Sequence, residues 1–103
     1  MMLAIIVSSI TAIAQTNGKI SGKITDGITG EPLQGATVTV KRTNNSVTTA
    51  SDGSFTLSNV KPGRATLVIS YIGFADKETT LSVPDGGEAT LNSTLQTSTK
   101  TED

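Results

Sequence analysis

The chain is 103 residues long, carries eight basic and nine acidic residues for a formal net charge of −1, and contains neither His nor Cys. This length fits one domain with a single core. The lack of Cys excludes disulfides and thiolate chemistry, the lack of His excludes Ser-His-Asp catalysis and His-ligated zinc, and charges spread along the chain without a cationic footprint argue against nucleic acid as a partner.

The first segment, residues 1–14, is apolar, has no charged side chain and ends in Ala12-Ile13-Ala14. A small-x-small ending after an apolar core is typical of a secretory signal peptide, so we expect cleavage before Gln15. No Lys or Arg precedes the apolar core, which departs from that pattern. A membrane anchor or a first strand is the alternative, although the segment is shorter than the roughly 20 residues that a spanning helix needs.

The mature chain opens with a predicted strand at residues 18–26, in which Ile20, Gly22 and Ile24 share one face. Three glycines and a proline follow in residues 26–35 and predict a loop. We expect Leu33 to anchor this loop to the core.

Residues 36–42 alternate apolar and polar side chains, which predicts a strand with Ala36, Val38 and Val40 facing inward. Asn44-Asn45 predicts a hairpin turn into the strand of residues 46–50, because Asn tolerates left-handed backbone. Asp52-Gly53 predicts a second turn of this kind, before a strand at residues 54–60 in which Phe55 and Leu57 lie on the same face.

After a turn at residues 61–64, residues 65–74 are apolar on both faces. Leu67, Ile69 and Tyr71 would face one way and Val68 and Ile72 the other. This pattern predicts a central strand between two covered surfaces.

Two further strands, residues 76–83 and 88–95, are separated by the turn residues 84–87. Their inward candidates are Leu81, Val83, Leu91 and Leu95. Seven short strands with turns about every eight to twelve residues predict an all-β, seven-stranded Greek-key β-sandwich. We assign residues 15–97 to this domain and expect residues 98–103 to be a disordered tail.

No constellation of side chains supports a catalytic, cofactor-binding or metal-binding assignment, and none is made. The carboxylate pairs that could serve as general acid and general base are Asp26 with Glu31, Asp76 with Glu78, and Asp85 with Glu88. All lie in or beside turn-rich sequence, so we expect exposed charges. The basic residues Lys41, Arg42, Lys61 and Arg64 have no interleaved aromatics and are interpreted as solvated loop charges.

Several residues at consistent spacing form a larger motif over residues 18–96: Gly22, Asp26, Gly30, Pro32, Leu33, Gly35, Ala36, Val38, Val40, Asp52, Gly53, Phe55, Leu57, Val60 and the block of residues 70–74. This motif resembles the carboxypeptidase regulatory-like domain, a transthyretin-like (prealbumin-like) sandwich often found ahead of TonB-dependent outer-membrane receptors. In such receptors the domain lies in the periplasm before an energy-coupling segment, a plug and a transmembrane barrel.

The resemblance implies an exported, non-enzymatic module at the periplasmic face of the outer membrane, with a protein partner in an uptake system for nutrients. It implies no cofactor and identifies no small-molecule substrate. Related domains often have the sequence Thr-Asp-x-Asp-Gly at this turn, and its oxygens could hold a calcium ion. This chain has Ala50 in place of the earlier Asp. One carboxylate is therefore missing, and a calcium site at Asp52 is disfavoured. Related sequences also tend to carry Gly where this chain has Arg42.

Other interpretations stay open from the sequence. A secreted carbohydrate-binding or adhesive spacer would need an exposed aromatic platform, for which Tyr71 and Phe74 are the candidates. An enzyme would need a buried carboxylate pair with a raised pKa. The end at Asp103 fits a truncated receptor N-terminus or a free-standing relative.

Overall fold

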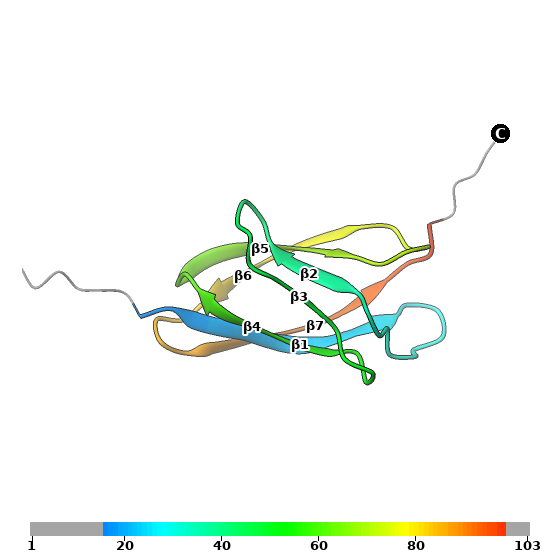
Figure 1. The fold of residues 1–103 in the computed structure, drawn as a ribbon, viewed down its shortest axis with the longest axis horizontal. Helices are drawn as coiled ribbons and strands as arrows, with labels where there is room; N and C mark the ends of the chain where they lie inside the picture. The colour runs from blue at the N-terminus through cyan, green and yellow to red at the C-terminus, as the bar shows by residue number, and fades with distance from the viewer. Residues whose placement is uncertain (1–15, 99–103) are drawn as a thin grey trace, which may run out of the picture.

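The computed structural model describes residues 16–98, which form seven β-strands and no helix (Figure 1). The strands are β1 (Gly18–Asp26), β2 (Thr37–Val40), β3 (Ser46–Thr48), β4 (Ser54–Val60), β5 (Gly63–Ser70), β6 (Lys77–Val83) and β7 (Glu88–Leu95). The predicted seven-stranded all-β fold is confirmed. The expected signal peptide lies outside the described residues, as does the expected tail apart from Ser98.

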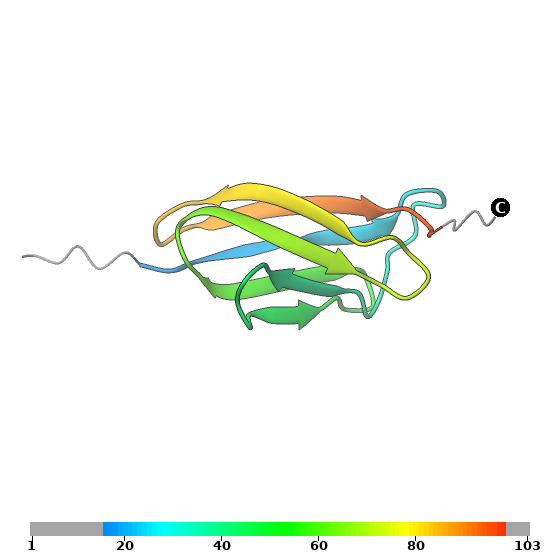
Figure 2. The ribbon, with the colours of Figure 1, turned by 90° about the horizontal axis from the view of Figure 1, so that it is seen from above.

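The strands form a two-layer sandwich (Figure 2). A three-stranded sheet has the order β4-β1-β7, and a four-stranded sheet has the order β3-β2-β5-β6. The pairing of β1 with β7 is parallel, and every other pairing is antiparallel. Because successive strands reverse direction, the loops after β1, β3 and β5 lie at one end of the sandwich and those after β2, β4 and β6 at the other.

The core lies between the two sheets and is built from the inward residues of alternating strands. Its fully buried large side chains are Ile20, Ile24, Leu57, Leu67, Ile69, Leu95 and Val38. Leu33 is 7% exposed, so the prediction that it anchors the loop after β1 is confirmed. The inward predictions for β6 and β7 are also confirmed: Val83 and Leu95 are buried, and Leu81 and Leu91 pack against the core.

Gly22 is required where β1 runs beside β7. It is paired with Leu91 in the parallel ladder, and a Cβ at this position would overlap the Leu91 carbonyl oxygen. The absence of a side chain therefore allows the two backbones to approach closely.

The expectation that β5 is covered on both faces is wrong. Leu67 and Ile69 are fully buried, whereas Val68 is only half-buried on the outer face and Ile72 is 89% exposed in the loop after the strand. A sandwich of two layers covers one face of each sheet, so the outer apolar residues of β5 face solvent.

The β2–β3 hairpin forms, but its left-handed residue is not the predicted Asn44-Asn45. Arg42 takes the positive φ, at 71°, and the Thr43 amide donates to the Val40 carbonyl at 3.1 Å to close the turn. Asn45 instead reaches across to β4, where its side-chain nitrogen donates to the Ser58 carbonyl at 2.8 Å. The Asn45 side chain is thus used to cap the edge of β4.

A bulge near the end of β4 changes which side chains enter the core. Ile20 of β1 is paired with Leu57, but Gly18 is paired with Val60, so β4 carries one extra residue in this interval. Asn59, with φ of 56°, absorbs the extra residue. As a result Val60 is turned inward and is 2% exposed, whereas strict alternation from Leu57 would place Asn59 in the core.

The segment after β7 is held by the loop between β5 and β6. The Ala75 amide donates to the Gln96 carbonyl at 2.9 Å, and the Ser98 amide donates to the Gly73 carbonyl at 3.1 Å. At the edge of β7, the Lys77 ammonium donates to the Thr94 carbonyl at 3.2 Å.

Within residues 16–98 no helix is long and apolar enough to cross a membrane.

Candidate functional site

Four of the six carboxylates that the sequence singles out are bonded to separate partners. Asp26 accepts the Ile28 amide at 2.8 Å, Asp85 accepts the Thr16 amide at 2.7 Å, and Glu88 accepts the Ser21 hydroxyl. Glu78 pairs with Lys41 at 3.2 Å. These four carboxylates each hold a turn or a neighbouring strand, and no hydrogen bond joins any of them to the other member of its predicted pair.

Asp52 closes the turn before β4. Its Oδ1 accepts the Ser54 hydroxyl at 2.6 Å and the Ser54 amide at 3.0 Å. These two bonds, the hydroxyl foremost, lower the pKa of Asp52 below its ordinary value. Gly53 follows with φ of 82° and is buried, and a Cβ there would lie 2.6 Å from the Ile24 carbonyl oxygen.

The interpretation of Asp52-Gly53 as a turn is therefore confirmed. Across residues 16–98, no group of three or more acidic side chains is placed to hold a metal ion.

The two aromatic residues of the loop after β5 pack inward. Tyr71 and Phe74 lie with ring centroids 5.4 Å apart and ring planes tilted by 50°, and both are half-buried against the core. Ile72 between them points to solvent instead. The aromatic pair thus braces the loop and does not form an exposed stacking platform.

The structure brings together basic residues that are apart in the sequence. Lys41 and Arg42 follow β2, while Lys61 and Arg64 flank the short link between β4 and β5, and both places lie at the same end of the sandwich. All four line one cleft of about 600 Å³. The prediction that these side chains are exposed is confirmed, but the expectation that charge is spread without a cationic surface is wrong.

The cleft has an apolar floor and a polar rim. Val40, Val60 and Ala65 form the floor, where the core reaches the end of the sandwich, and the rest of the lining is polar: Asn17, Lys41, Arg42, Thr43, Asn45, Asn59, Lys61, Arg64, Thr66, Glu78 and Thr80. An apolar base with convergent hydrogen-bonding groups is typical of small-ligand sites.

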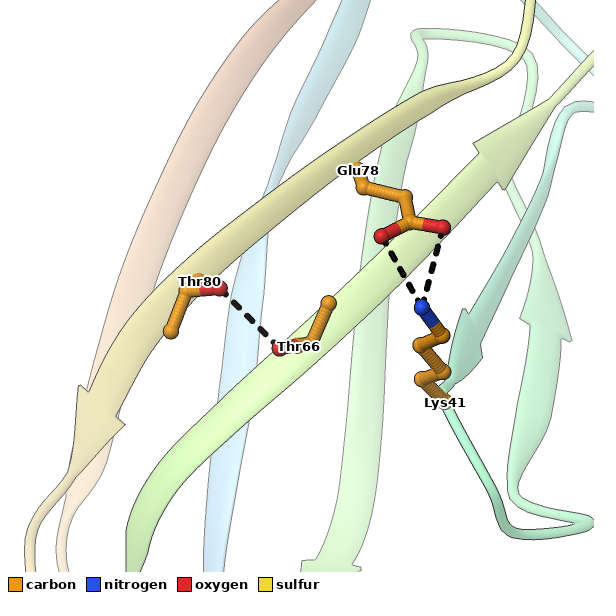
Figure 3. Close-up of polar contacts among 4 residues, drawn as sticks. All are labelled: Lys41, Thr66, Glu78 and Thr80. Carbon is orange, nitrogen blue, oxygen red and sulfur yellow. Dashed lines mark hydrogen bonds and ion pairs between the residues drawn. The ribbon is translucent and has the colours of Figure 1, made fainter.

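One wall of the cleft is formed by the outer face of β5 and β6 (Figure 3). Here the Lys41 ammonium donates to both carboxylate oxygens of Glu78 at 3.2 Å, and the hydroxyls of Thr66 and Thr80 lie 3.0 Å apart. The Lys41 and Glu78 side chains are 44% and 54% exposed, so water screens their ion pair.

Sequence reasoning missed this cleft because it weighed each basic pair by itself. The signal was present in the series of predicted strands: where successive strands reverse direction, the turns after the second and fourth strands fall at the same end of the sandwich. The positive φ of Arg42 could not be predicted from the sequence, because Asn44-Asn45 is the stronger local turn sequence and drew the prediction to itself.

Comparison with known proteins gives the chain a family context. Residues 19–96 match the family model of the carboxypeptidase regulatory-like domain. A TonB-dependent receptor of Formosa agariphila is 34% identical over 90 residues, which cover 87% of this chain and 8% of the receptor. The chain thus spans a small fraction of that relative's length.

Two solved structures are similar to the sandwich. A putative membrane-associated protein of unknown function from Bacteroides fragilis is 32% identical with a TM-score of 0.58, and the match covers 84% of this chain and 30% of that one. A type II cohesin-X-dockerin complex from Acetivibrio cellulolyticus has a TM-score of 0.66 at 22% identity, over 78% of this chain and 58% of that one. The second similarity concerns the fold alone.

Proposed function

Because the chain belongs to the family of carboxypeptidase regulatory-like domains, we propose that it is an exported module without catalytic activity that serves a TonB-dependent outer-membrane receptor in nutrient uptake. The observation that carries this proposal is the 34% identity to such a receptor over 87% of the chain. Its location in this proposal is the periplasm, at the periplasmic face of the outer membrane.

The side chains support a role without turnover. The sequence contains no His and no Cys, which are the commonest bases and nucleophiles near neutral pH. The side chains of Asp26, Glu78 and Asp85 are bonded to separate partners, so no hydrogen bond joins the members of a candidate pair as shared acid and base catalysis would need.

We assign the contact with a protein partner to the end of the sandwich that carries the loops after β1 and β5. Ser98, the last described residue, lies at this end. Among residues 16–98, the exposed large hydrophobic residues are Ile28 in the loop after β1, at 70%, and Ile72 in the loop after β5, at 89%. Their neighbours Gly27 and Gly73 bond the carbonyl of Leu95 and the amide of Ser98, so both loops flank the last described segment. Two exposed isoleucines at one end of the sandwich are apolar side chains that contact with another protein would cover.

The edges of the three-stranded sheet, β4 and β7, are less suited to that contact. Asn45 caps a carbonyl on the edge of β4, and Lys77 caps one on the edge of β7. Side chains that occupy edge carbonyls hinder the addition of a foreign strand. A carbohydrate-binding spacer is disfavoured too, because Tyr71 and Phe74 pack against the core.

Single-cysteine crosslinking tests the proposal, since the natural chain has no Cys. Ala75→Cys places a benzophenone maleimide beside Ile72, and Thr56→Cys places it on the outer face of the three-stranded sheet as the control. After irradiation with outer-membrane and periplasmic fractions of the native organism, we expect the label at position 75 to capture uptake-system proteins identified by mass spectrometry.

The crosslink should weaken when Ile72→Ser is added to Ala75→Cys, because the exposed isoleucine is lost. Equal products from positions 75 and 56, or products without any uptake-system protein, would count against the proposal.

A further inference from the structure

The cleft at the β2–β3 end concentrates positive charge. Four of the eight basic residues of the chain line it, namely Lys41, Arg42, Lys61 and Arg64, and Glu78 is its single acid out of nine. Four positive charges and one negative charge leave the lining at +3, whereas the whole chain has a net charge of −1. The residues outside the cleft lining carry a net negative charge, so the cleft is where the charges of the chain favour an anion.

Backbone strain falls in the same place. Two non-glycine residues in the described chain have positive φ, Arg42 at 71° and Asn59 at 56°, and both line the cleft. A glycine would hold the conformation of Arg42 at lower cost, whereas Asn tolerates left-handed backbone, so the strain lies at Arg42. Strained positions cluster at ligand sites because the side chain held there has a use that offsets the strain.

The donors around the cleft are varied in kind. Two guanidinium groups can each grip an oxyanion with paired N–H donors, and two ammonium groups can act as point charges. One hydroxyl of the bonded pair Thr66 and Thr80 and the side-chain amides of Asn45 and Asn59 add neutral donors on the same lining. The Thr43 hydroxyl donates instead to the Val40 carbonyl at 2.8 Å.

We propose that this cleft binds a small ligand carrying at least two oxyanion groups, carboxylate or phosphate in kind. One anionic group is held by Lys41 and Arg42 and the other by Lys61 and Arg64, while the ligand body lies over Val40, Val60 and Ala65. An incoming anion competes with Glu78 for Lys41. This site goes beyond the role in uptake and does not depend on it, because the isolated chain carries every residue concerned.

Isothermal titration of the purified chain tests the site, with citrate and inorganic pyrophosphate as the probes at about 20 mM salt, where surface electrostatics are least screened. We expect a one-to-one complex with Kd below about 1 mM. The double variant Lys41→Gln/Arg64→Gln should weaken binding by at least about tenfold, since it removes one charge-assisted donor from each group.

The matched control is Lys19→Gln/Lys23→Gln, which removes the same charge from the exposed outer face of β1, and it should retain most of the affinity. Glu78→Gln should tighten binding about threefold, because Lys41 loses its competitor. Circular dichroism of each variant shows that it is folded, and the gain in Glu78→Gln cannot come from unfolding.

The proposal is overturned by three results: no binding of either probe, equal losses in the two double variants, or a clear preference for a tetraglutamate peptide over both probes. The last result would assign the cleft to an acidic protein segment. None of these outcomes bears on the crosslinking at position 75, so the two proposals succeed or fail separately.

Discussion

Arg42 has a backbone conformation that residues with a Cβ rarely adopt, with φ of 71°. We predict that Arg42→Gly raises the free energy of unfolding by about 1 kcal/mol, because left-handed backbone costs a side chain roughly that much. Urea denaturation followed by far-UV circular dichroism measures the change. The same variant should bind the anionic probes more weakly, so stability and binding would move in opposite directions.

Arg64→Gly is the control for that gain. Arg64 lies in β5 and is absent from the residues with positive φ, so glycine there should lower the free energy of unfolding by about 0.5–1 kcal/mol. If Arg42→Gly were no more stable than the natural chain, the strain argued for Arg42 would be refuted.

Asp52 makes the stability of the domain depend on pH. The Ser54 hydroxyl and amide lower its pKa in the folded state, so the ionised carboxylate stabilises the fold above the unfolded pKa, and this contribution is lost as the pH falls through the folded pKa. We predict that Asp52→Ala has a lower Tm than the natural chain at about pH 6, and that the difference narrows by about pH 3.

Ser54→Ala provides the second test of the Asp52 turn. It removes the hydroxyl donor and keeps the amide, so it should reduce the pH dependence of the Tm without abolishing it. A Tm difference between Asp52→Ala and the natural chain that stays constant across this pH range would show that the bonds to Ser54 do not stabilise the ionised form.

Among the strands, β1 and β7 approach each other only because Gly22 has no side chain. Gly22→Ala should lower the free energy of unfolding by about 3 kcal/mol, since the added methyl would overlap the Leu91 carbonyl oxygen and part the two strands. Gly30→Ala is the matched change: no atom lies within 4 Å of its new Cβ, and only its φ of 77° opposes the substitution. Equal costs for the two variants, compared by denaturation midpoints, would contradict the close approach.

The bulge in β4 makes Val60 a core residue. We predict that Val60→Ala costs about 2 kcal/mol of unfolding free energy, because two buried methyl groups are lost and a cavity remains. Val68→Ala on the outer face of β5 removes the same atoms from a half-buried site and should cost less than half as much. A cost for Val60→Ala no larger than that for Val68→Ala, in the same denaturation assay, would place Val60 outside the core.

Over the whole molecule, period-two alternation predicted the seven strands and most of the core, because a one-residue shift would turn every apolar side chain to solvent. It failed where the ladder is irregular. Val60 enters the core through a bulge that alternation cannot foresee, and Val68 and Ile72 are apolar without being covered. Their pattern is the same as that of a strand buried on both faces, and only the number of layers distinguishes the two.

The candidate site was less predictable than the fold, since it depends on which loops meet. Lys41 and Arg64 are each ordinary surface charges. They become part of a candidate anion site only because they line the same cleft at one end of the sandwich. The two non-glycine residues with positive φ in the described chain, Arg42 and Asn59, lie at that end as well. A sequence lists such residues in separate turns, and the reversal of successive strands brings them together.

The claim that the chain is an exported module of an outer-membrane receptor is tested by fractionating cells of the native organism and sequencing the N-terminus of the protein by mass spectrometry. The claim predicts recovery in the periplasmic or outer-membrane fraction, with the mature chain beginning at Gln15. Recovery in the cytoplasm with residues 1–14 intact would contradict it.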